Sequence, residues 1–169
     1  MKRVVVIGSG GAGKSTFARS LSERTGLPLI HLDAHYWQPG WKPTPRDKWR
    51  LHVEKLVAKD EWIMDGNFQS TFDLRLPRAD TIFYLDYSRF LCLFRALKRI
   101  WQWRGQTRSD MGEGCPEKIM DLNFARWIWN YPDVERPKVI ERLNELTEGR
   151  QIVVLRSPKQ TQAYLDELH

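Results

Sequence analysis

Near the N-terminus the chain reads Gly8-Ser9-Gly10-Gly11-Ala12-Gly13-Lys14-Ser15-Thr16. This stretch matches the phosphate-binding pattern GxxxxGK[ST] in full. The run from Lys2 to Ile7 that precedes it predicts a buried strand, and the residues from Lys14 to Arg24 predict a helix that Gly26 ends. Strand, glycine-rich loop and helix in this order are the context in which the pattern binds phosphate.

The residue types of this loop suit the polyphosphate of a nucleotide. Backbone N–H groups at the start of a helix form a cradle for an anion, and glycine allows the close approach that this needs. We expect Lys14 to reach the β- and γ-phosphates and Ser15 to offer its hydroxyl to Mg²⁺. The loop from Gly8 to Thr16 is therefore predicted to bind ATP, with GTP not distinguished from it. The alternative is a turn that only packs a helix against a strand. It leaves the presence of Lys14 and Ser15 unexplained, because packing does not require them.

Length and composition indicate one globular unit. The 169 residues fit a single domain spanning residues 1–169. The longest apolar runs are of strand length, well short of the roughly 20 residues of a membrane span, so we expect no membrane partner. No signal-peptide pattern precedes the first strand, and Cys92 and Cys115 are too isolated for a disulfide framework. These features predict a cytoplasmic protein.

Positive charge is concentrated in one segment. The chain carries 27 basic and 21 acidic residues, which gives a net charge of +6. Six basic residues and no acidic one lie between Asp86 and Asp110, namely Arg89, Arg95, Lys98, Arg99, Arg104 and Arg108. This segment requires an anionic partner, and both nucleic acid and a pocket for polyphosphates meet that requirement.

Segments of strand character alternate with segments of helical character. The predicted strands are Lys2–Ile7, Leu27–Leu32, Glu61–Met64, Thr81–Leu85 and Gln151–Leu155. The predicted helices cover 14–24, a stretch from about residue 46, 90–103, a region that ends near residue 130, 137–148 and 158–168. This alternation predicts an α/β fold with a mostly parallel sheet and with ligands at the carboxyl ends of its strands.

Two segments between these elements are predicted to lack regular structure. Tyr36–Pro45 contains three prolines, one glycine and two tryptophans. Gln106–Pro116 is predicted to be a mobile cover or its hinge, within a basic lid segment around 100–116. Aromatic residues of the first segment, Tyr36, Trp37 and Trp41, either stack on a ring of a bound acceptor or fill the core. Four further tryptophans are predicted to be packing residues on helices, namely Trp101, Trp103, Trp127 and Trp129.

Five segments carry a resemblance to a known family. They are GSGGAGKST, LPLIHLDAHYW with a following PGW, WIMDGNF, YLDYSRFLCLFRALKR and VVLRSPKQ. In this order they resemble the nucleoside monophosphate kinase branch of the P-loop proteins, most closely the adenylate-kinase-like family known as DNA topology modulation proteins. The resemblance implies a three-layer α/β/α P-loop NTPase fold with a mostly parallel five-stranded sheet and a small helical lid.

The resemblance also implies residues that contact the nucleotide. Adenylate kinases have an aspartate that closes a strand and arginines nine and thirteen positions later, and Asp86, Arg95 and Arg99 reproduce this spacing. Arg95 would then lie against the adenine, and Arg99 would touch the phosphates. The alternative is an exposed cationic face on a solvated helix.

Lid arginines and an adenine-binding turn are implied in the same way. Arg104 and Arg108 would be lid arginines that stabilise the charge of the transferring phosphoryl group. The turn around Ser157 and Pro158 matches the place where such kinases wrap backbone around the adenine.

Two aspartates complete the predicted site. Asp65 stands where adenylate kinases hold magnesium through water, and the alternative is a turn-forming Asp-Gly pair. Gln69 stands where those kinases have arginine, and no arginine follows Asp33 in its loop, so the usual clamps for an acceptor phosphate are missing unless Arg75 or Arg78 compensates. Asp33 ends the second predicted strand, where related small-molecule kinases hold the acceptor hydroxyl, and it is predicted to be a base or orienting group. The alternative for Asp33 is a strand-end cap or an ion pair.

Three functions are compatible with these features. The first is a magnesium-dependent phosphotransferase that moves the γ-phosphoryl of ATP to a nucleotide, a nucleoside or another small hydroxyl compound. The second is a DNA-binding or topology-modulating regulatory protein with nucleotide as a switch, although no DNA-binding motif is found. The third is an ATPase without a small acceptor, and the chain is expected to be a monomer or homodimer. The residues predicted to be catalytic are Lys14, Asp33, Arg99, Arg104 and Arg108.

Overall fold

A parallel β-sheet forms the centre of the computed structural model, which describes residues 1–117, 121–146 and 149–168. Its five strands are hydrogen-bonded in the order β2-β5-β1-β6-β7, with every neighbouring pair parallel. They are β1 (Arg3–Gly8), β2 (Leu29–His31), β5 (Trp62–Asp65), β6 (Thr81–Leu85) and β7 (Gln151–Leu155). Because β1 is central, the glycine-rich loop that follows it lies in the middle of the carboxyl edge.

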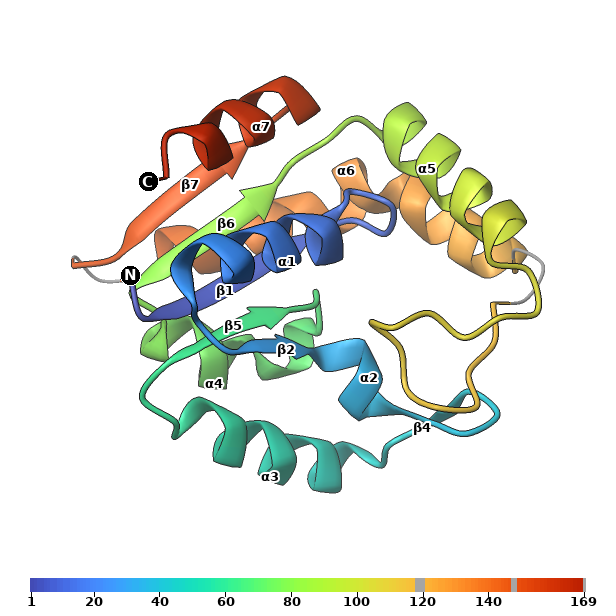
Figure 1. Cartoon of the computed structure of the whole chain (residues 1–169), viewed down its shortest axis with the longest axis horizontal. Helices are drawn as coiled ribbons and strands as arrows, with labels where there is room; N and C mark the ends of the chain where they lie inside the picture. The colour runs from blue at the N-terminus through green and yellow to red at the C-terminus, as the bar shows by residue number, and fades with distance from the viewer. Residues whose placement is uncertain (118–120, 147–148, 169) are drawn as a thin grey trace.

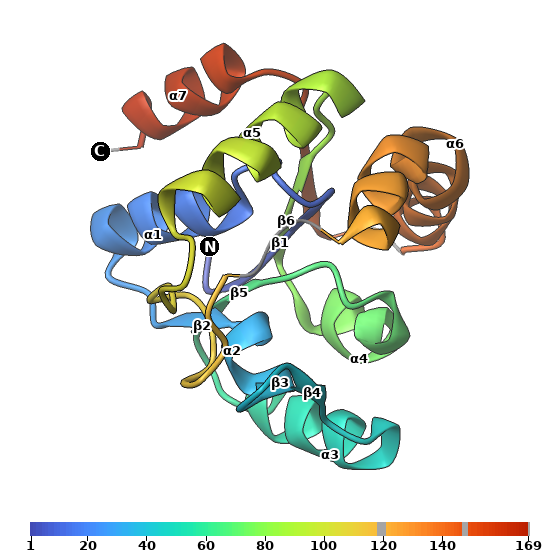
Figure 2. The same cartoon turned by 90° about the vertical axis from the view of Figure 1, so that its right-hand side faces the viewer.

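Helices cover both faces of this sheet, so the molecule has three layers (Figures 1 and 2). Side chains of one core cluster come from α1 (Lys14–Thr25), α5 (Arg89–Gln102) and α7 (Pro158–Asp166). Those of the other come from α3 (Arg46–Val57), α4 (Phe72–Arg75) and α6 (Leu122–Asn144). Successive residues of β1 alternate between the two clusters, because side chains of a strand point to opposite faces. The predicted α/β architecture is confirmed.

Local signals define the ends of the helices beside the loop. Gly26 ends α1 with φ +73°, and its N–H donates to the Ser22 carbonyl at 2.8 Å. Ser88 caps α5 by accepting a hydrogen bond from the Leu91 N–H, and Ser157 caps α7 in the same way from Gln160. These caps fix the starting points of two helices that border the loop.

The segment that was predicted to hold two helices forms one. Helix α6 continues through Pro132 and Pro137, each of which removes a backbone hydrogen bond. Its buried residues Ile128, Tyr131 and Val139 pack into the core on both sides of Pro132, and this burial outweighs the local cost of the prolines. The predicted end at Glu148 lies outside the described residues.

The region after β2 also differs from the sequence prediction. The second strand ends at His31, and Asp33 lies in the first turn of α2 (Leu32–Tyr36) instead of at a strand end. The segment 36–45, predicted to be irregular, contains a short antiparallel pair of β3 (Trp37–Gln38) and β4 (Lys42–Pro43). Two short 3₁₀ turns flank α4, at Gln69–Thr71 and Leu76–Arg78.

The lid segment around 100–116 is helical only at its beginning. Helix α5 ends at Gln102, and the chain then runs through turns to an isolated bridge between Arg104 and Glu117. Turns replace a helix there because Gly105, Gly112 and Gly114 interrupt it. In the described part of the chain, no helix is both long and apolar enough to span a membrane.

Three of the four tryptophans predicted to be packing residues on helices are exposed. Trp101 is 80% exposed, Trp129 is 41% exposed, and Trp103 is 39% exposed and lies just beyond the end of α5. Trp127 alone of the four packs against both core clusters. The prediction was wrong for the others because helical spacing does not reveal which face of a helix meets the core.

Arg75 is a structural residue and does not clamp an acceptor. Its side chain is fully buried and donates hydrogen bonds to Thr71 Oγ1 and to the carbonyl oxygens of Gly66 and Phe68, at 3.0 to 3.1 Å. Burial lowers the pKa of Arg75 to about 9, so it remains cationic at neutral pH. The other arginine suggested for that role, Arg78, is exposed on the surface.

Replacing Arg75 by methionine is expected to lower the free energy of unfolding by about 3 kcal/mol, because buried oxygens lose their donors. Denaturant unfolding followed by circular dichroism measures this change. The matched change Arg78→Met, on the exposed arginine, should leave stability within about 0.5 kcal/mol of the parent. Equal effects of the two changes would contradict a structural role for Arg75.

Candidate functional site

The loop between β1 and α1 passes so close to other backbone that only glycine fits. A Cβ at Gly11 would lie 2.1 Å from the carbonyl oxygen of Cys92 in α5, and Gly11 has φ +77°. Gly13, with φ +88°, begins α1 without a side-chain cap. The first N–H groups of α1 therefore have no intrahelical acceptor and are available to an anion.

Lys14 lies at the centre of this loop. Its Nζ donates to the Ser9 carbonyl oxygen at 2.9 Å, which folds the side chain back over the loop. Burial lowers the pKa of Lys14, and the carboxylates of Asp65 and Asp33 act in the opposite direction. Lys14 is half-buried, and its charge is offset only in part, so it is electrostatically suited to receive a phosphate group.

Asp65 sits at the end of β5 and is 4% exposed. One carboxylate oxygen, Oδ2, is 2.9 Å from Nδ1 of His31, its partner residue on the neighbouring strand β2. The other oxygen, Oδ1, is buried and accepts no hydrogen bond from any described residue. An orphaned carboxylate oxygen beside a phosphate-binding loop is a suitable anchor for Mg²⁺.

Few protein groups are placed to coordinate such an ion. No group of three or more His, Cys, Asp or Glu residues in the described ranges can hold a metal. Mg²⁺ fits this situation, because it keeps several waters and uses one or two protein oxygens together with substrate phosphates. The residues that would hold it are Ser15, in the first turn of α1, and Asp65.

Asp33 faces the same centre from α2. Burial and the nearby Asp65 raise the pKa of Asp33, while Lys14 and Arg108 partly oppose the shift. Asp33 is therefore a carboxylate whose proton affinity is increased, beside the loop lysine.

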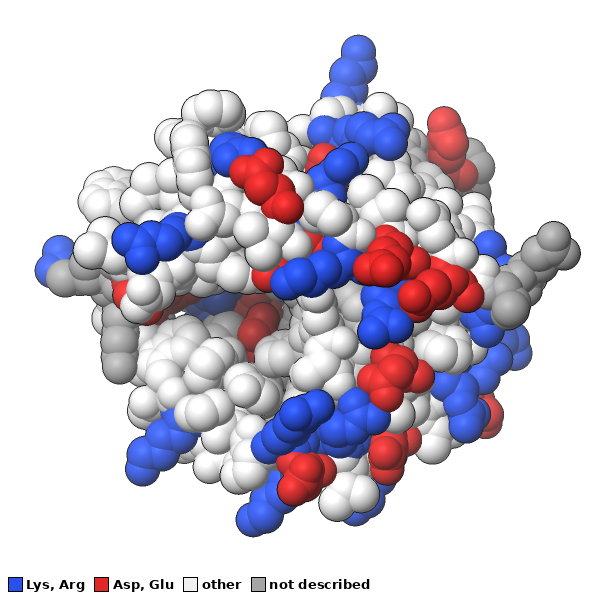
Figure 3. Space-filling view, turned by 180° about the vertical axis from the view of Figure 1, so that it is seen from behind, with Lys and Arg blue, Asp and Glu red and all other residues white. Residues whose placement is uncertain are grey.

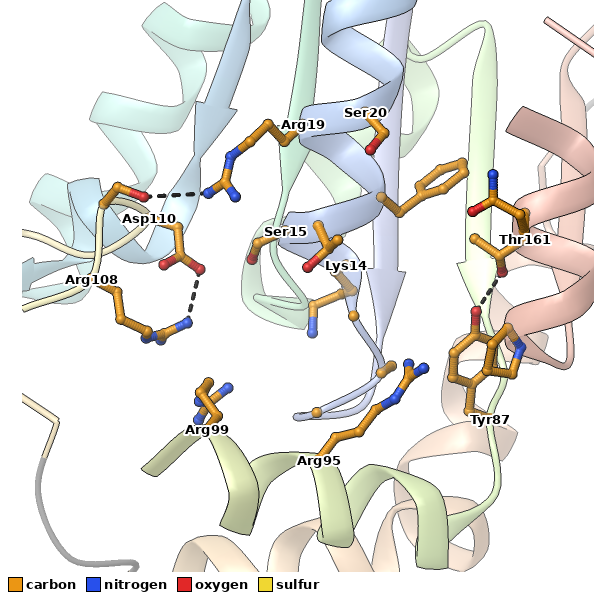
Figure 4. Close-up of a pocket in the computed structure, with 18 of the residues that line it drawn as sticks. Lys14, Ser15, Arg19, Ser20, Tyr87, Arg95, Arg99, Arg108, Asp110 and Thr161 are labelled. Carbon is orange, nitrogen blue, oxygen red and sulfur yellow. Dashed lines mark hydrogen bonds and ion pairs between the residues drawn. The ribbon is translucent and has the colours of Figure 1, made fainter. Parts of the chain in front are cut away.

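A first cavity of about 500 Å³ opens on one side of the loop. Its walls come from the loop, α1, α5, α7 and the lid segment, and Figure 4 shows Arg95 and Arg99 of α5 beside the loop. The Arg95 guanidinium lies over the Tyr87 ring at 5.6 Å, and the Tyr87 hydroxyl is hydrogen-bonded to Thr161 of α7. Pro158 lines this cavity, whereas Ser157 caps α7.

The lid segment brings one of its two predicted arginines to the loop. Arg108 pairs with Asp110 at 2.9 Å (Figure 4). It also reaches Glu117 at 2.8 Å, and Arg99 reaches the same Glu117 oxygen at 3.0 Å. Burial and the nearby Arg108 lower the pKa of Arg99. Arg104 is exposed and lines neither cavity, because it lies in the bridge region at the base of the lid.

A second cavity of about 790 Å³ lies on the other side of the loop. Asp33, Trp37 and Trp41 line it from the segment after β2, and α6 contributes Phe124 and Trp127. Tyr36 is turned away and packs against Trp49 and Phe68 in the core. The aromatic residues of this segment are thus divided between the cavity and the core.

Several residues of the site were not predicted. Glu117 joins the two arginines, His31 pairs with Asp65, and Arg136 of α6 pairs with Asp86 at 2.9 Å. Asp86 is thus held by Arg136, a residue fifty positions later in the chain. The one available signal for Glu117 was its position among the first acidic residues after the basic segment.

Solved structures share this architecture at low sequence identity. A shikimate kinase from Acinetobacter baumannii aligns with a TM-score of 0.63 and 14% identity, over 99% of this chain and 90% of its own. The fold is that of the P-loop kinases. A sugar kinase from Janibacter sp. HTCC2649 (TM-score 0.54, 18% identity, 98% and 93% coverage) and a deoxyadenosine kinase from M. mycoides (0.51, 16%, 98% and 98%) agree with this.

At these identities the likeness establishes the P-loop kinase fold alone. The chain matches no family sequence model and no curated protein. The chemistry of the site must therefore be argued from its own residues.

Replacing Asp33 by asparagine is expected to stabilise the folded protein at pH 8. The pKa of Asp33 in the folded protein lies above its ordinary value of 3.8, so ionising this group lowers the free energy of unfolding at every pH above its raised pKa. This loss of stability disappears as the pH falls toward 3.8. The variant should melt at a higher temperature than the parent at pH 8, and the difference should shrink toward pH 4, in thermal unfolding scans.

Asp73→Asn serves as the control. The hydrogen bond from Arg50 lowers the pKa of Asp73, so its loss should lower the melting temperature at pH 8 or leave it unchanged. An Asp33→Asn variant that melts at or below the temperature of the parent at pH 8 would contradict the assigned cost of the Asp33 charge.

Proposed function

We propose that this protein is a magnesium-dependent phosphotransferase that moves the γ-phosphoryl group of ATP to a small acceptor. The observation that supports it most is the position of Lys14, which lines both cavities. A nucleotide on one side and an acceptor on the other would meet at its ammonium group. Catalysis would then rest on positioning and charge neutralisation.

The first cavity would hold the nucleotide. Loop backbone from Gly11 to Ser15 lines its floor, and the cationic side chains of Arg95 and Arg99 line its wall. A guanidinium group both stacks on flat rings and binds phosphate oxygens, which suits Arg95 to the adenine and Arg99 to the phosphates. Pro158 would border the base from the start of α7. The ligand of the M. mycoides deoxyadenosine kinase, dCTP, supports a nucleotide as the ligand of this fold.

Magnesium would be held by the hydroxyl of Ser15 and, through water, by the carboxylate of Asp65. When bound, the ion would supply positive charge that neutralises phosphate oxygens. The orphaned Oδ1 of Asp65 supports this role, since His31 occupies only the other oxygen. His31 would thereby fix the orientation of the carboxylate.

Arg99 and Arg108 would stabilise the charge of the transferring group. Both line the junction of the two cavities with Lys14. Donors that are already oriented cost no reorganisation when charge develops, and the carboxylates of Glu117 and Asp110 hold these two arginines in place. Asp33 would orient the acceptor hydroxyl and accept its proton.

The basic segment supports a kinase more than a DNA-binding protein. Of its six basic residues, Arg95, Arg99 and Arg108 line the cavities, and Arg89 is paired with Asp133 at 2.8 Å. On the face shown in Figure 3, basic and acidic side chains are interspersed. Continuous phosphate backbone requires an accumulation of positive charge, and the polyphosphate of a single nucleotide does not.

The Lys14→Met change tests the proposal directly. With ATP, Mg²⁺ and a panel of nucleosides, nucleoside monophosphates and small alcohols, ADP release should rise with at least one acceptor. The Lys14→Met variant should lose at least about 100-fold of that rate, because a charge-stabilising donor is removed. Lys55→Met, at an exposed position of α3, should retain the parental rate. Absence of acceptor-stimulated turnover across the panel would reject the proposal.

Asp65→Asn tests the metal role separately. The variant should need at least about tenfold more Mg²⁺ for half-maximal turnover, because it loses the anionic anchor. Turnover measured over a Mg²⁺ titration gives this value, and Asp60→Asn, at an exposed position, is the control. An unchanged Mg²⁺ requirement in Asp65→Asn would contradict the assignment.

A further inference from the structure

The two cavities share a set of lining residues, which we call the junction. Elsewhere the second cavity is lined mainly by carboxylates and aromatic side chains. Residues that line both cavities are Gly11, Lys14, Ser15, Arg99, Arg108 and Asp110. All the cationic side chains among the described lining residues of the second cavity belong to this set. Among these described residues, positive charge therefore lies at the end where a phosphoryl group would be transferred.

Carboxylates line the second cavity beyond the junction. They belong to Asp33, Glu117, Asp121 and Glu135. Of these four, Glu117 is paired with Arg99 and Arg108, and Glu135 is paired with Lys138 at 3.3 Å. Asp33 and Asp121 form no ion pair with any described residue, so they leave net negative charge in this part of the cavity. A phosphate or carboxylate group on an acceptor would meet repulsion in this part of the cavity, whereas an N–H donor or a cation would be attracted.

Aromatic side chains line the same space. Trp37 and Trp41 meet edge to face with their ring centroids 5.6 Å apart, and Phe124 and Trp127 of α6 are stacked at 5.9 Å. Phe68 lines the cavity from the segment after β5. Such side chains favour a planar ring, because aromatic faces gain contact area with flat molecules.

Hydrogen-bond acceptors at the far end lack sufficient donors. Gln69 donates through Nε2 to Glu135 Oε2 at 2.7 Å, which leaves its own amide oxygen as an acceptor. The buried Oδ1 of Asn67 receives no hydrogen bond from the described part of the chain. Glu135 Oε1 already accepts a hydrogen bond from Lys138 Nζ at 3.3 Å. The oxygens that call for N–H donors from a bound molecule are therefore those of Asn67 and Gln69.

We propose that the acceptor is a nucleoside-like compound: a planar ring with exocyclic N–H donors and a free hydroxyl, and without an anionic group. The inference rests on the proposed function. The ring lies against the aromatic side chains, its N–H donors face Asn67 and Gln69, and its hydroxyl faces Asp33. The acceptor oxygen forms a bond to the γ-phosphorus, the bond to the β-phosphate oxygen breaks, ADP departs with that electron pair, and the hydroxyl proton moves to Asp33.

Matched probes test the proposal. Cytidine and CMP share the ring and the exocyclic amine and differ only by a phosphate, as do adenosine and AMP. Titration calorimetry with the full chain should give at least about tenfold tighter binding for one nucleoside than for its monophosphate. The same nucleoside should stimulate ADP release more than its monophosphate does. Tighter binding of the monophosphates, or no binding of either nucleoside, overturns the proposal.

The Glu135→Gln change tests whether the far end of the second cavity sets the preference for a nucleoside over its monophosphate. The change removes the negative charge that balances Lys138 and orients Gln69, with little change of shape. Nucleoside binding should therefore weaken by about tenfold, and the preference over the monophosphate should shrink because Lys138 is left without its carboxylate. Glu141→Gln, at an exposed position of the same helix, should leave both unchanged. A Glu135→Gln variant that binds nucleosides and monophosphates as the parent does also overturns the proposal.

ATP binding separates this inference from the proposed function. Glu135 does not line the first cavity, so the affinity for ATP should be the same in the parent and in Glu135→Gln. If the parent transfers phosphate to monophosphates in preference to nucleosides, the phosphotransferase stands and the acceptor class is wrong. If the parent neither binds ATP nor turns it over, the proposed function itself fails.

Discussion

The close contact between the loop after β1 and the backbone of α5 is the constraint on which the rest of the site depends. Gly11 approaches the Cys92 carbonyl oxygen to a distance that no other residue permits. This contact brings the start of α5 against the loop, and α5 then carries Arg95 and Arg99 to the cavities. The Ser88 cap and the pairing of Asp86 with Arg136 fix where that helix begins.

A balance of buried charges follows from this arrangement. Lys14, Arg99 and Arg108 converge near the loop. Removing these charges from water is unfavourable, and the surrounding carboxylates offset part of this cost. Different carboxylates serve different cations: Glu117 and Asp110 pair directly with the arginines, whereas Asp65 and Asp33 act on Lys14 through space. Because the carboxylates offset the burial of the Lys14 charge only in part, Lys14 is suited to bind an anion. A cation in a closed network of ion pairs is not.

The sequence predicted what depends on local pattern and missed what depends on tertiary contacts. The strands Thr81–Leu85 and Gln151–Leu155 and the C-terminus of α1 follow from apolar runs and a glycine, and their predicted bounds agree with the structure. The continuity of α6 through Pro132 and the burial of Arg75 depend on what packs against them. The same holds for the site: a motif revealed the loop, but only the folded chain reveals Glu117 between two arginines.

The placement of tryptophan has a spectroscopic consequence. Trp103, which the sequence pattern assigned to helix packing, lines the first cavity, whereas Trp37, Trp41 and Trp127 line the second. Indole emission responds to the polarity and to the quenching groups around it. The first cavity therefore carries one intrinsic fluorophore and the second carries three, and the emission lost on replacing Trp103 by phenylalanine is the contribution of the first cavity.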